Sequence, residues 1–293
     1  MLQRPFGNTG LPVSVLGLGA GHIGSPELAE EQVERLLHGA LDAGVRLIDT
    51  ARGYGLSEER IGRHLAGRRH QYVLSTKCGY GIPGYEDWTG PCITSGVEAA
   101  LERLRTDHID VMHLHSCPLH VLQRGDVIEA LQRAVQAGKV LVAGYSGDNE
   151  PLHWAVASGR FRSIQPSVNL CDQAAAGTVL PAAWKRGMGV IAKRPLANAP
   201  WRYEEPPQAE DVREYWERFR TLGLDRQGFD WDELALRFAA FMPGVSSCIV
   251  GTSTLGHLQR CAELIGRGPL PREVEAGLRE AFAWHGEDWK GLV

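Results

Sequence analysis

Hydrophobic and polar positions along this chain switch repeatedly between the period of a strand and that of a helix. A short hairpin with its turn at residues 8–10 is expected first, and the apolar run over residues 13–18 predicts a strand. Ser25 and Pro26 then predict the start of a helix, as N-cap and first-turn proline, and Gly44 predicts its end. The apolar residues that share one face of this helix are Val33, Leu36, Leu37, Ala40 and Leu41.

The same change of period recurs to the end of the chain. Strands are predicted over residues 13–18, 45–49, 72–77, 109–115, 140–145, 163–168, 189–193 and 247–250. Further helices are predicted over residues 57–67, 95–104, 126–137, 149–159, 174–186, 209–222 and 230–241. Ser95 and Glu98 would form a capping box for one of them, and Asn149 would cap another. Eight strands, each followed by a helical pattern, predict one α/β domain over residues 1–293, a (β/α)8 TIM barrel with an N-terminal β-hairpin.

A glycine string at residues 19–24 supports a second interpretation, a doubly wound dinucleotide-binding fold. The string matches G-x-G-x-x-G, follows a strand and precedes a helix, and Asp49 ends the next strand. In that motif the helix begins within the glycines, so that its N-terminus meets a pyrophosphate, whereas Ser25 and Pro26 put the start later. Because six further βα units would also be left over, we interpret the string as the first loop of a barrel.

Composition excludes several classes of protein without selecting a function. The 293 residues are 43% hydrophobic and 23% charged with a formal net charge of −4, as is typical of globular proteins. Basic residues are scattered, so neither nucleic acid nor a membrane is an expected partner. The N-terminus does not resemble a signal peptide, no long apolar stretch is present, and the six cysteines form no CxxC pair, which predicts reduced thiols in the cytoplasm. Nothing in the sequence indicates an oligomeric state.

Four side chains with complementary chemistry follow neighbouring strands of the predicted barrel. Asp49, Lys77 and His115 end the second, third and fourth strands, and Tyr54 lies in the loop after Asp49. Active sites of such barrels form where the strands end, and alternate residues of a strand share a face, so these side chains should meet above the core. Each of them alone has an ordinary interpretation as a turn residue, a packed aromatic or a solvated charge.

Together the four residues suit the reduction of a carbonyl group. An ammonium beside a phenol favours the phenolate and lowers the pKa of the phenol. Asp49 would hold Lys77 in place by a charge-assisted hydrogen bond. His115 could then orient a carbonyl group beside the hydroxyl of Tyr54.

The segments around these residues resemble the signature segments of the aldo-keto reductases, in order and over nearly the whole chain. The matching stretches are Asp49-Thr50-Ala51-x-x-Tyr54-Gly55-x-Ser57-Glu58, Ser75-Thr76-Lys77, Asp110-Val111-x-x-Leu114-His115 and Gly138-Lys139-Val140-x-x-x-Gly144-Tyr145-Ser146. The resemblance, which is to the bacterial type of aldo/keto reductase, implies an NADPH-dependent oxidoreductase that reduces small aldehydes or ketones to alcohols. It also implies the catalytic tetrad Asp49, Tyr54, Lys77 and His115, in which Tyr54 is the general acid.

The resemblance further implies where the nicotinamide cofactor binds. Ser146 and Gln165 match the positions that hold the carboxamide, residues 193–196 match the segment that wraps the nicotinamide and pyrophosphate, and residues 251–257 match the adenosine-phosphate segment. The complete expected set is Gly19, Ala20, Asp49, Ser146, Gln165, Lys193, Arg194, Pro195, Leu196, Gly251, Thr252, Ser253 and His257.

The chain departs from the family pattern in three places. Gly147 stands where asparagine is common, and Lys193 stands where an aromatic residue commonly stacks on the nicotinamide. The phosphate segment lacks the frequent lysine and arginine, and offers His257 and Arg260 instead. The resemblance implies NADPH as the cofactor, and these departures leave NADH as the alternative.

Three other functions stay open. His113 and His115 form an H-x-H of the kind used by metal-dependent barrel hydrolases, but the fifth and sixth strands end without histidine or carboxylate. No metal is therefore expected, and His113 is interpreted as a core residue. Cys78 and Cys117 adjoin the site as conceivable nucleophiles, yet the neighbour of a strand-end residue faces the opposite way. The main alternative is a catalytically idle nicotinamide-binding barrel that acts as a redox sensor or scaffold.

Loop lengths indicate an open substrate site. The loop over residues 78–93 carries the candidate substrate residues Tyr80, Tyr85 and Trp88, which could equally pin this loop onto the barrel. The loop over residues 116–123 and the tail over residues 286–293 are short, which predicts broad specificity for small carbonyl compounds. An insertion over residues 198–230 is expected to cover the cofactor or extend the pocket through its aromatic residues Trp201, Tyr203, Tyr215 and Trp216.

Overall fold

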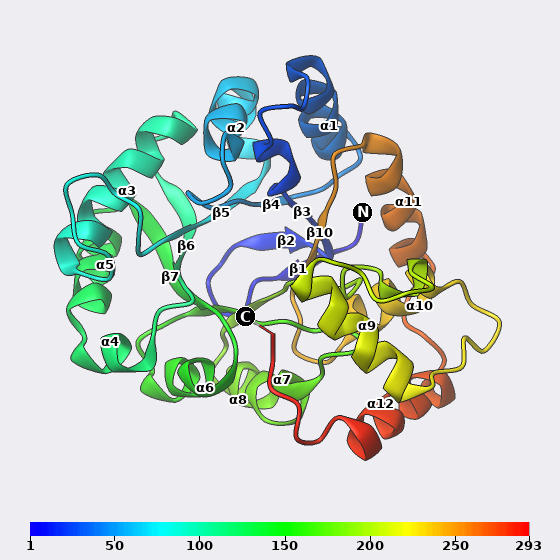
Figure 1. Ribbon diagram of the computed structural model, residues 1–293. Helices are drawn as coiled ribbons and strands as arrows, with labels where there is room; N and C mark the ends of the chain where they lie inside the picture. Colours follow the sequence, from blue (N-terminus) through cyan, green and yellow to red (C-terminus); the bar gives the residue numbers. More distant parts are fainter. Residues whose placement is uncertain (293) are drawn as a thin grey trace.

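The parallel strands of this chain close into a barrel that is surrounded by helices (Figure 1). The structure is a computed structural model and describes residues 1–292. The barrel strands follow one another in the order β10-β3-β4-β5-β6-β7-β8-β9, and a separate antiparallel pair, β1 with β2, precedes them in the chain. The predicted (β/α)8 barrel with an N-terminal hairpin is therefore confirmed. Within residues 1–292, no helix is long and apolar enough to cross a bilayer.

The strands are β1 (Gln3–Pro5), β2 (Pro12–Ser14), β3 (Leu16–Gly19), β4 (Leu47–Asp49), β5 (Val73–Cys78), β6 (Ile109–His115), β7 (Val140–Ser146), β8 (Ser163–Gln165), β9 (Gly189–Ala192) and β10 (Ser247–Gly251). The α-helices are α1 (Glu30–Asp42), α2 (Ser57–Leu65), α3 (Gly90–Leu104), α4 (Leu119–Arg124), α5 (Asp126–Gln136), α6 (Asn149–Ser158), α7 (Ala174–Gly177), α8 (Val179–Lys185), α9 (Glu210–Leu222), α10 (Trp231–Phe241), α11 (Leu255–Gly266) and α12 (Arg272–His285). Short 3₁₀ turns are η1 (His22–Gly24), η2 (Ala66–Gln71) and η3 (Pro200–Arg202).

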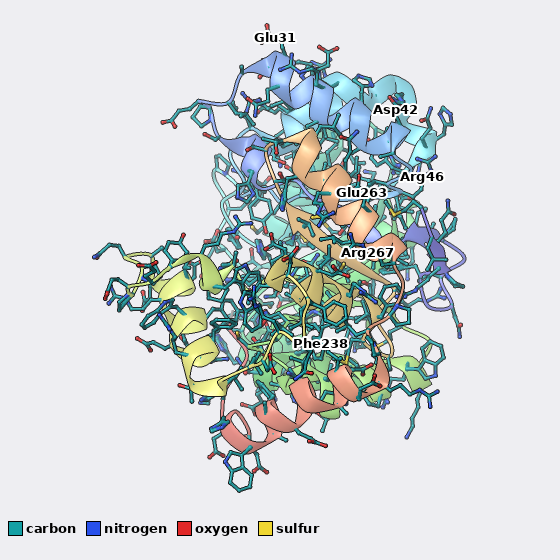
Figure 2. The ribbon with its side chains drawn as sticks, turned by 90° about the vertical axis from the view of Figure 1, so that its right-hand side faces the viewer. Glu31, Asp42, Arg46, Phe238, Glu263 and Arg267 are labelled. Atoms are coloured by element: carbon teal, nitrogen blue, oxygen red, sulfur yellow. The ribbon has the colours of Figure 1, made fainter. Side chains whose placement is uncertain are left out.

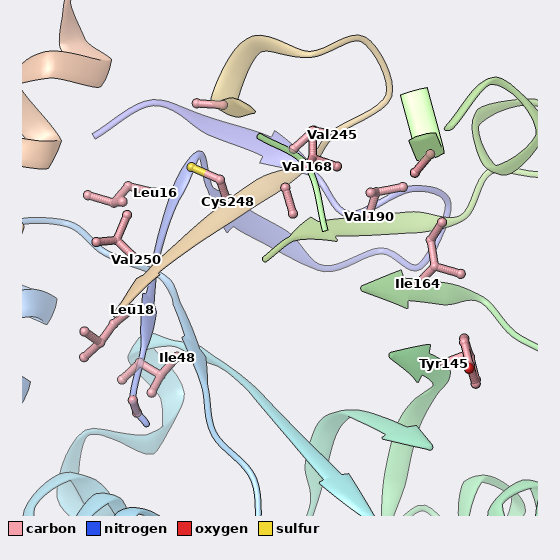
Figure 3. Packing of buried hydrophobic residues seen from close by; sticks show 14 of the residues in the cluster. Leu16, Leu18, Ile48, Tyr145, Ile164, Val168, Val190, Val245, Cys248 and Val250 are labelled. Carbon is pink, nitrogen blue, oxygen red and sulfur yellow. The ribbon is translucent and has the colours of Figure 1, made fainter. Parts of the chain in front are cut away.

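Side chains on the two faces of the barrel strands form two separate cores, as expected where parallel strands are buried on both sides. The inner core consists of Phe6, Val13, Leu47, Val73, Val111, Val142, Ile191 and Ile249. The outer core packs against the helices and includes Leu16, Leu18 and Val250 of the paired strands β3 and β10 (Figure 3). Because Leu47 and Val73 face inward, Asp49 and Lys77, which share their parity, rise from the inner face toward the ends of the strands.

The hairpin closes the N-terminal end of the barrel. β1 and β2 lie across its middle in Figure 1, and the ring of Phe6 is completely buried there. A Cβ atom on Gly189 would lie 2.6 Å from that ring, so only glycine fits at the start of β9. Asn8 anchors the turn by donating its backbone N–H to the Gly187 carbonyl at 2.8 Å. The C-terminal end of the barrel is therefore the end available for a functional site.

Helices α1, α10, α11 and α12 form one side of the outer layer (Figure 2). Glu31 of α1, Glu263 of α11 and Arg267, which directly follows α11, lie on the solvent side, whereas Phe238 of α10 is buried against the barrel. This separation of charged and apolar faces is the amphipathic pattern that predicted the helix ending at Gly44 and the helix over residues 230–241, whereas no ranges were predicted for α11 and α12.

The first helix does not begin at Ser25 and Pro26, and this prediction was wrong. The chain forms η1 and then a turn, and α1 begins only at Glu30. The buried guanidinium of Arg60 in α2 donates to the backbone carbonyls of Ile23, Ser25 and Leu28 at 2.6 to 2.7 Å. It holds this stretch in a non-helical turn, which puts the helix even farther from the glycine string than expected.

Two predicted helix caps were also wrong, although the helix predicted over residues 149–159 does begin at residue 149. Ser95 and Glu98 lie inside α3, which begins after Thr89, whose hydroxyl accepts from the backbone N–H of Cys92 at 3.4 Å. Asn149 does not cap α6 either. It is the first residue of that helix and has a left-handed φ of 61°.

The helix predicted over residues 174–186 is divided into α7 and α8 at Thr178. Pro181 gives the physical reason, because its ring would clash with the Gly177 carbonyl in a continuous helix. The break leaves α7 as a single turn.

Candidate functional site

A cleft of about 580 Å³ lies at the C-terminal ends of the barrel strands, opposite the hairpin. All four expected tetrad residues, Asp49, Tyr54, Lys77 and His115, line it. β4, β5 and β6 are adjacent strands, and they carry three of these residues on one side of the barrel mouth. The structure therefore brings together residues that are far apart in the sequence.

Asp49 and Lys77 form a buried ion pair at the base of the cleft. The Lys77 ammonium lies 2.6 Å from Asp49 Oδ2 and also donates to the Thr50 carbonyl at 2.8 Å. Burial alone would lower the pKa of Lys77, but the charge of Asp49 and the hydroxyl of Tyr54 outweigh it and raise this pKa. The lysine is thus a fixed positive charge at neutral pH.

Tyr54 stands beside this charge on a tightly packed loop. The Lys77 Nζ atom lies 4.9 Å from the centroid of the Tyr54 ring. A Cβ atom on Gly24 would lie only 1.8 Å from the Tyr54 carbonyl oxygen, and Leu56 donates its N–H to the Gly24 carbonyl at 3.0 Å. Glycine at position 24 is therefore explained by close contact with the Tyr54 loop, not by a Rossmann fingerprint.

His115 completes the group as a neutral imidazole. Burial, reinforced by the charge of Lys77, lowers the pKa of His115 to about 3. Its ring meets the Tyr54 ring edge-on, with centroids 6.0 Å apart and an interplanar angle of 88°. Two hydrogen-bonding groups, a phenol and an imidazole, thus lie next to one ammonium in the cleft.

His113 lies one layer below the cleft as a core histidine. It is completely buried, and its Nε2 and Nδ1 atoms lie 3.0 Å from Ser163 Oγ and 3.4 Å from Ser75 Oγ. Burial lowers its pKa to about 3. Within residues 1–292, no group of three or more His, Cys, Asp or Glu side chains could hold a metal ion. The geometry gives no support to a metallohydrolase.

The two cysteines that adjoin the tetrad are poor candidates for a nucleophile. Cys78 and Cys117 are both buried free thiols, and neither lines the cleft. Burial raises the pKa of Cys117 to about 12 and raises the pKa of Cys78 as well. Neither thiolate is therefore available at neutral pH.

Most of the expected cofactor residues line the same cleft. Those that do are Gly19, Asp49, Ser146, Gln165, Lys193, Arg194, Pro195, Leu196, Gly251 and His257. Ala20, Thr252 and Ser253 are not among the lining residues. The Ala20 carbonyl accepts from Ser57 Oγ at 2.7 Å, and the Thr252 hydroxyl donates to the Thr254 carbonyl at 3.2 Å, so both groups serve loop structure instead.

A chain of buried hydrogen bonds connects this cofactor set to the tetrad. Ser146 Oγ donates to Gln165 Oε1 at 2.8 Å, and Gln165 Nε2 donates to Asp49 Oδ1 at 2.8 Å. Ser75 Oγ donates to the same oxygen of Asp49 at 2.7 Å. Hydroxyl and amide groups in the cleft, with cationic Lys193 and Arg194 beside them, fit the carboxamide and phosphates of a nicotinamide nucleotide.

Lys193 has a partner that the sequence did not indicate. Its ammonium lies 2.8 Å from Asp148 Oδ2, and both side chains are nearly buried. Burial lowers the pKa of Lys193, while Asp148 opposes that shift. Asp148 stands two residues beyond β7 and was not itself singled out from the sequence, although Ser146, Gly147 and Asn149 were.

The C-terminal tail packs against the same side of the cleft. Leu292 donates its N–H to Asp172 Oδ2 at 3.0 Å, and its carbonyl accepts from Arg194 Nη1 at 2.6 Å. Asn149 donates to the Gly291 carbonyl at 2.9 Å and accepts from the Gly291 N–H at 2.8 Å. Only the length of this tail was used in prediction from the sequence, and the structure shows that the tail supports the segment that begins at Lys193.

The far end of the cleft is lined by the insertion after β9. The lining residues from this insertion are Asn198, Ala199, Arg202, Asp211 and Val212. Arg202 was not singled out from the sequence, whereas Arg260, which was, pairs with Glu263 at 3.5 Å and does not line the cleft. The insertion thus extends the pocket through small and charged residues, while its aromatic side chains stay outside the cleft.

The three candidate substrate residues do not line the cleft in this structure, but one of them reaches the tetrad. Tyr80 Oη lies 2.8 Å from His115 Nδ1, and the two rings stack with centroids 5.5 Å apart. Trp88 packs on Tyr80 at 5.7 Å, whereas Tyr85 is exposed.

Comparison with known proteins agrees with this arrangement. Residues 15–281 match the model of the aldo/keto reductase family. L-galactose dehydrogenase from Arabidopsis thaliana is 27% identical over 87% of this chain and 85% of its own length. A probable voltage-gated potassium channel subunit beta from the same plant is 27% identical over 92% of this chain and 93% of its own length.

A solved structure is similar over almost the whole fold. The holo form of the aldo-keto reductase AKR11C1 from Bacillus halodurans superposes with a TM-score of 0.83 at 25% identity, covering 96% of each chain. The family match spans most of the chain and includes every strand of the barrel. The chain therefore belongs to the aldo/keto reductase family, whose members are NAD(P)H-dependent oxidoreductases.

Proposed function

We propose that this protein is an NADPH-dependent reductase of small aldehydes and ketones, with Tyr54 as general acid. The observation that carries the proposal is the convergence of Tyr54, His115 and the Asp49–Lys77 ion pair in one cleft. A phenol beside a buried ammonium and a neutral imidazole is suited to give a proton to a developing alkoxide. When bound, the cofactor supplies the hydride that reduces the carbonyl carbon.

Side chains of the protein bind the carbonyl oxygen and transfer the proton. Tyr54 holds the carbonyl oxygen by hydrogen bonding and gives it a proton as negative charge develops there. Lys77, fixed by Asp49, stabilises the resulting phenolate electrostatically until solvent returns the proton. His115 is neutral and acts as a second hydrogen-bond donor to the same oxygen, without competing as an acid.

The cationic groups along the cleft favour NADPH over NADH. Arg202, Lys193 and Arg194 line the cleft as cations, whereas burial lowers the pKa of His257, which lines it as a neutral imidazole. The adenosine phosphate is expected near Arg202 and His257. Arg202 Nη2 lies 3.3 Å from Asp232 Oδ2, and the Arg202 side chain is 57% exposed, so it remains accessible to a ligand. A dianionic phosphate would gain from this charge, whereas a ribose hydroxyl would gain little.

A second function is favoured by one relative, the probable potassium channel subunit beta. The barrel could bind nicotinamide nucleotide and act mainly as a redox-sensing subunit of another protein. The complete and tightly hydrogen-bonded tetrad weighs against this function, because an idle barrel does not need a buried ion pair beside a phenol.

Fluorescence titration with NADPH and NADH tests the proposal, followed by initial rates with aldehydes and ketones and the reduced nucleotides, and with sugars and the oxidised nucleotides. We expect tighter binding of NADPH and turnover of small carbonyl compounds at rates that depend on enzyme concentration. The sugar substrates are included because the relative L-galactose dehydrogenase is named for oxidation of a sugar. Binding without turnover of any substrate would favour the redox-sensing function.

A further inference from the structure

Tyr80 makes a contact with the tetrad that family membership alone does not explain. Its hydroxyl lies 2.8 Å from His115 Nδ1, and its ring stacks on the imidazole at an interplanar angle of 26°. The stacking contact limits the tilt of the imidazole ring, and the hydrogen bond limits its rotation within the ring plane. The contact fixes one of the two nitrogens of His115.

The loop that carries Tyr80 is braced so that this contact is fixed in advance. Trp88 packs on the Tyr80 ring and donates its backbone N–H to the Gly79 carbonyl at 2.7 Å. Gly79 has a φ of 142°, and a Cβ atom there would lie 2.2 Å from the Trp88 ring. The loop therefore closes only with glycine at position 79. Asp87 ties the turn by accepting from the Gly81 N–H at 2.8 Å.

The direction of the hydrogen bond follows from the chemistry of the two groups. Burial raises the pKa of Tyr80, so it keeps its proton at neutral pH, while the neutral His115 carries a single N–H. The bare nitrogen of an imidazole is a stronger acceptor than a phenol oxygen, whose lone pairs are shared with its ring. The favoured arrangement is O–H donated to Nδ1, and the nitrogen that accepts cannot be the one that bears the proton.

We infer that Tyr80 is a positioning residue that fixes the tautomer of His115, holding the imidazole proton on Nε2 for the substrate carbonyl. Within residues 1–292, Nε2 has no hydrogen-bond partner, and the imidazole lines the cleft beside Tyr54, so this N–H is available to a ligand. The inference rests on the proposed function for its catalytic consequence, but the tautomer itself is a property of the protein alone. Tyr80 thereby acts through His115 rather than on the substrate.

The test is a long-range ¹H–¹⁵N correlation spectrum of protein with ¹⁵N-labelled histidine, with His115 assigned by loss of its signals in His115→Gln. Wild type should carry the proton on Nε2. Tyr80→Phe keeps the stacked ring and removes the hydroxyl, so it should mix the two tautomers and lower kcat roughly tenfold with little change in KM. Tyr72→Phe, which removes a hydroxyl at the opposite end of β5, should change neither quantity.

Three results would overturn the positioning role: a proton on Nδ1 in wild type, an unchanged tautomer in Tyr80→Phe, or an unchanged kcat in that variant. Failure of the proposed function has a different signature. If wild type reduced no carbonyl compound, or if Tyr54→Phe kept full activity, the reductase mechanism would be lost while the spectra still decided the tautomer.

Discussion

Lys193 and Asp148 form an ion pair 2.8 Å long on the wall of the cleft, with side-chain exposures of 15% and 3%. The lysine occupies the position at which this family commonly has an aromatic residue. Its charge is balanced within the protein, and Asp148 is itself held by the Ser167 N–H at 2.8 Å. The wall of the cleft is therefore polar here, where an aromatic residue would make it apolar.

Removal of one partner should destabilise the protein strongly. Asp148→Asn leaves the Lys193 ammonium buried without a counter-charge, and such a loss typically costs about 3–5 kcal/mol. Urea denaturation measures the change in the free energy of unfolding. Glu98→Gln is the matched control, because the Glu98–Lys139 pair is exposed and should contribute less than about 1 kcal/mol. Equal effects of the two substitutions would show that burial of the Lys193 pair is unimportant.

Asp172 should make stability decrease between about pH 4 and pH 7. Burial, reinforced by Asp148, raises its pKa to about 7 from an ordinary value of 3.8. In that window the folded protein keeps the proton while the unfolded chain loses it, so the free energy of unfolding decreases as pH rises. Asp172→Asn removes this dependence and should gain stability relative to wild type from pH 4.5 to pH 8. The gain should be a few kcal/mol.

Thermal or urea unfolding of wild type and Asp172→Asn at pH 4.5 and at pH 8 measures how the difference in stability changes with pH. Asp42→Asn, at an exposed position of α1, serves as the control and should differ from wild type equally at both. A pH-independent difference for Asp172→Asn would contradict the assignment.

Gly24→Ala should damage activity more than stability. The added Cβ would lie 1.8 Å from the Tyr54 carbonyl oxygen, so the loop that carries the phenol has to move. A displacement of about 1 Å in a catalytic group can cost on the order of 100-fold in rate. Initial rates and a thermal melt would be compared with those of Gly67→Ala, where a Cβ meets nothing within 4 Å. Normal turnover of Gly24→Ala would show that the Tyr54 loop tolerates displacement.

Arg202 and His257 should distinguish the two nucleotides. The double variant Arg202→Ala/His257→Ala should weaken NADPH by roughly tenfold or more and leave NADH nearly unchanged, because charged hydrogen bonds to a phosphate contribute about 1.5–3 kcal/mol each. Fluorescence titration measures both dissociation constants. Arg260→Ala should weaken neither, since Arg260 lies outside the cleft. Equal weakening of both nucleotides by the double variant would remove the phosphate-reading role.

The barrel and the convergence of Asp49, Tyr54, Lys77 and His115 in one cleft could be predicted because they depend on local patterns. Leu47 with Asp49 and Val73 with Lys77 share strand parity, and this parity alone puts the carboxylate and the ammonium above the inner core. The segment motifs then connected Tyr54 and His115 to the same end of the barrel. No long-range information was needed for these inferences.

The remaining features depend on contacts between distant parts of the chain. Arg60 prevents a helix start that Ser25 and Pro26 favour locally. No pattern near residue 25 indicates that the guanidinium of Arg60 will hydrogen-bond to the backbone there. Arg202 reaches the cleft only because the insertion folds back over the strand ends. Asp148, which follows β7, forms its ion pair with Lys193, which follows β9. Tertiary packing overrides local preference in each case.

The most direct test of the account is Tyr54→Phe, which removes the proposed proton donor and keeps the ring that packs beside Lys77. NADPH oxidation with 4-nitrobenzaldehyde and NADPH binding by fluorescence would be measured on the same preparations. The account predicts that kcat falls by about 100-fold or more while the dissociation constant of NADPH stays within about twofold of wild type. Turnover close to that of wild type would contradict the assignment of Tyr54 as general acid.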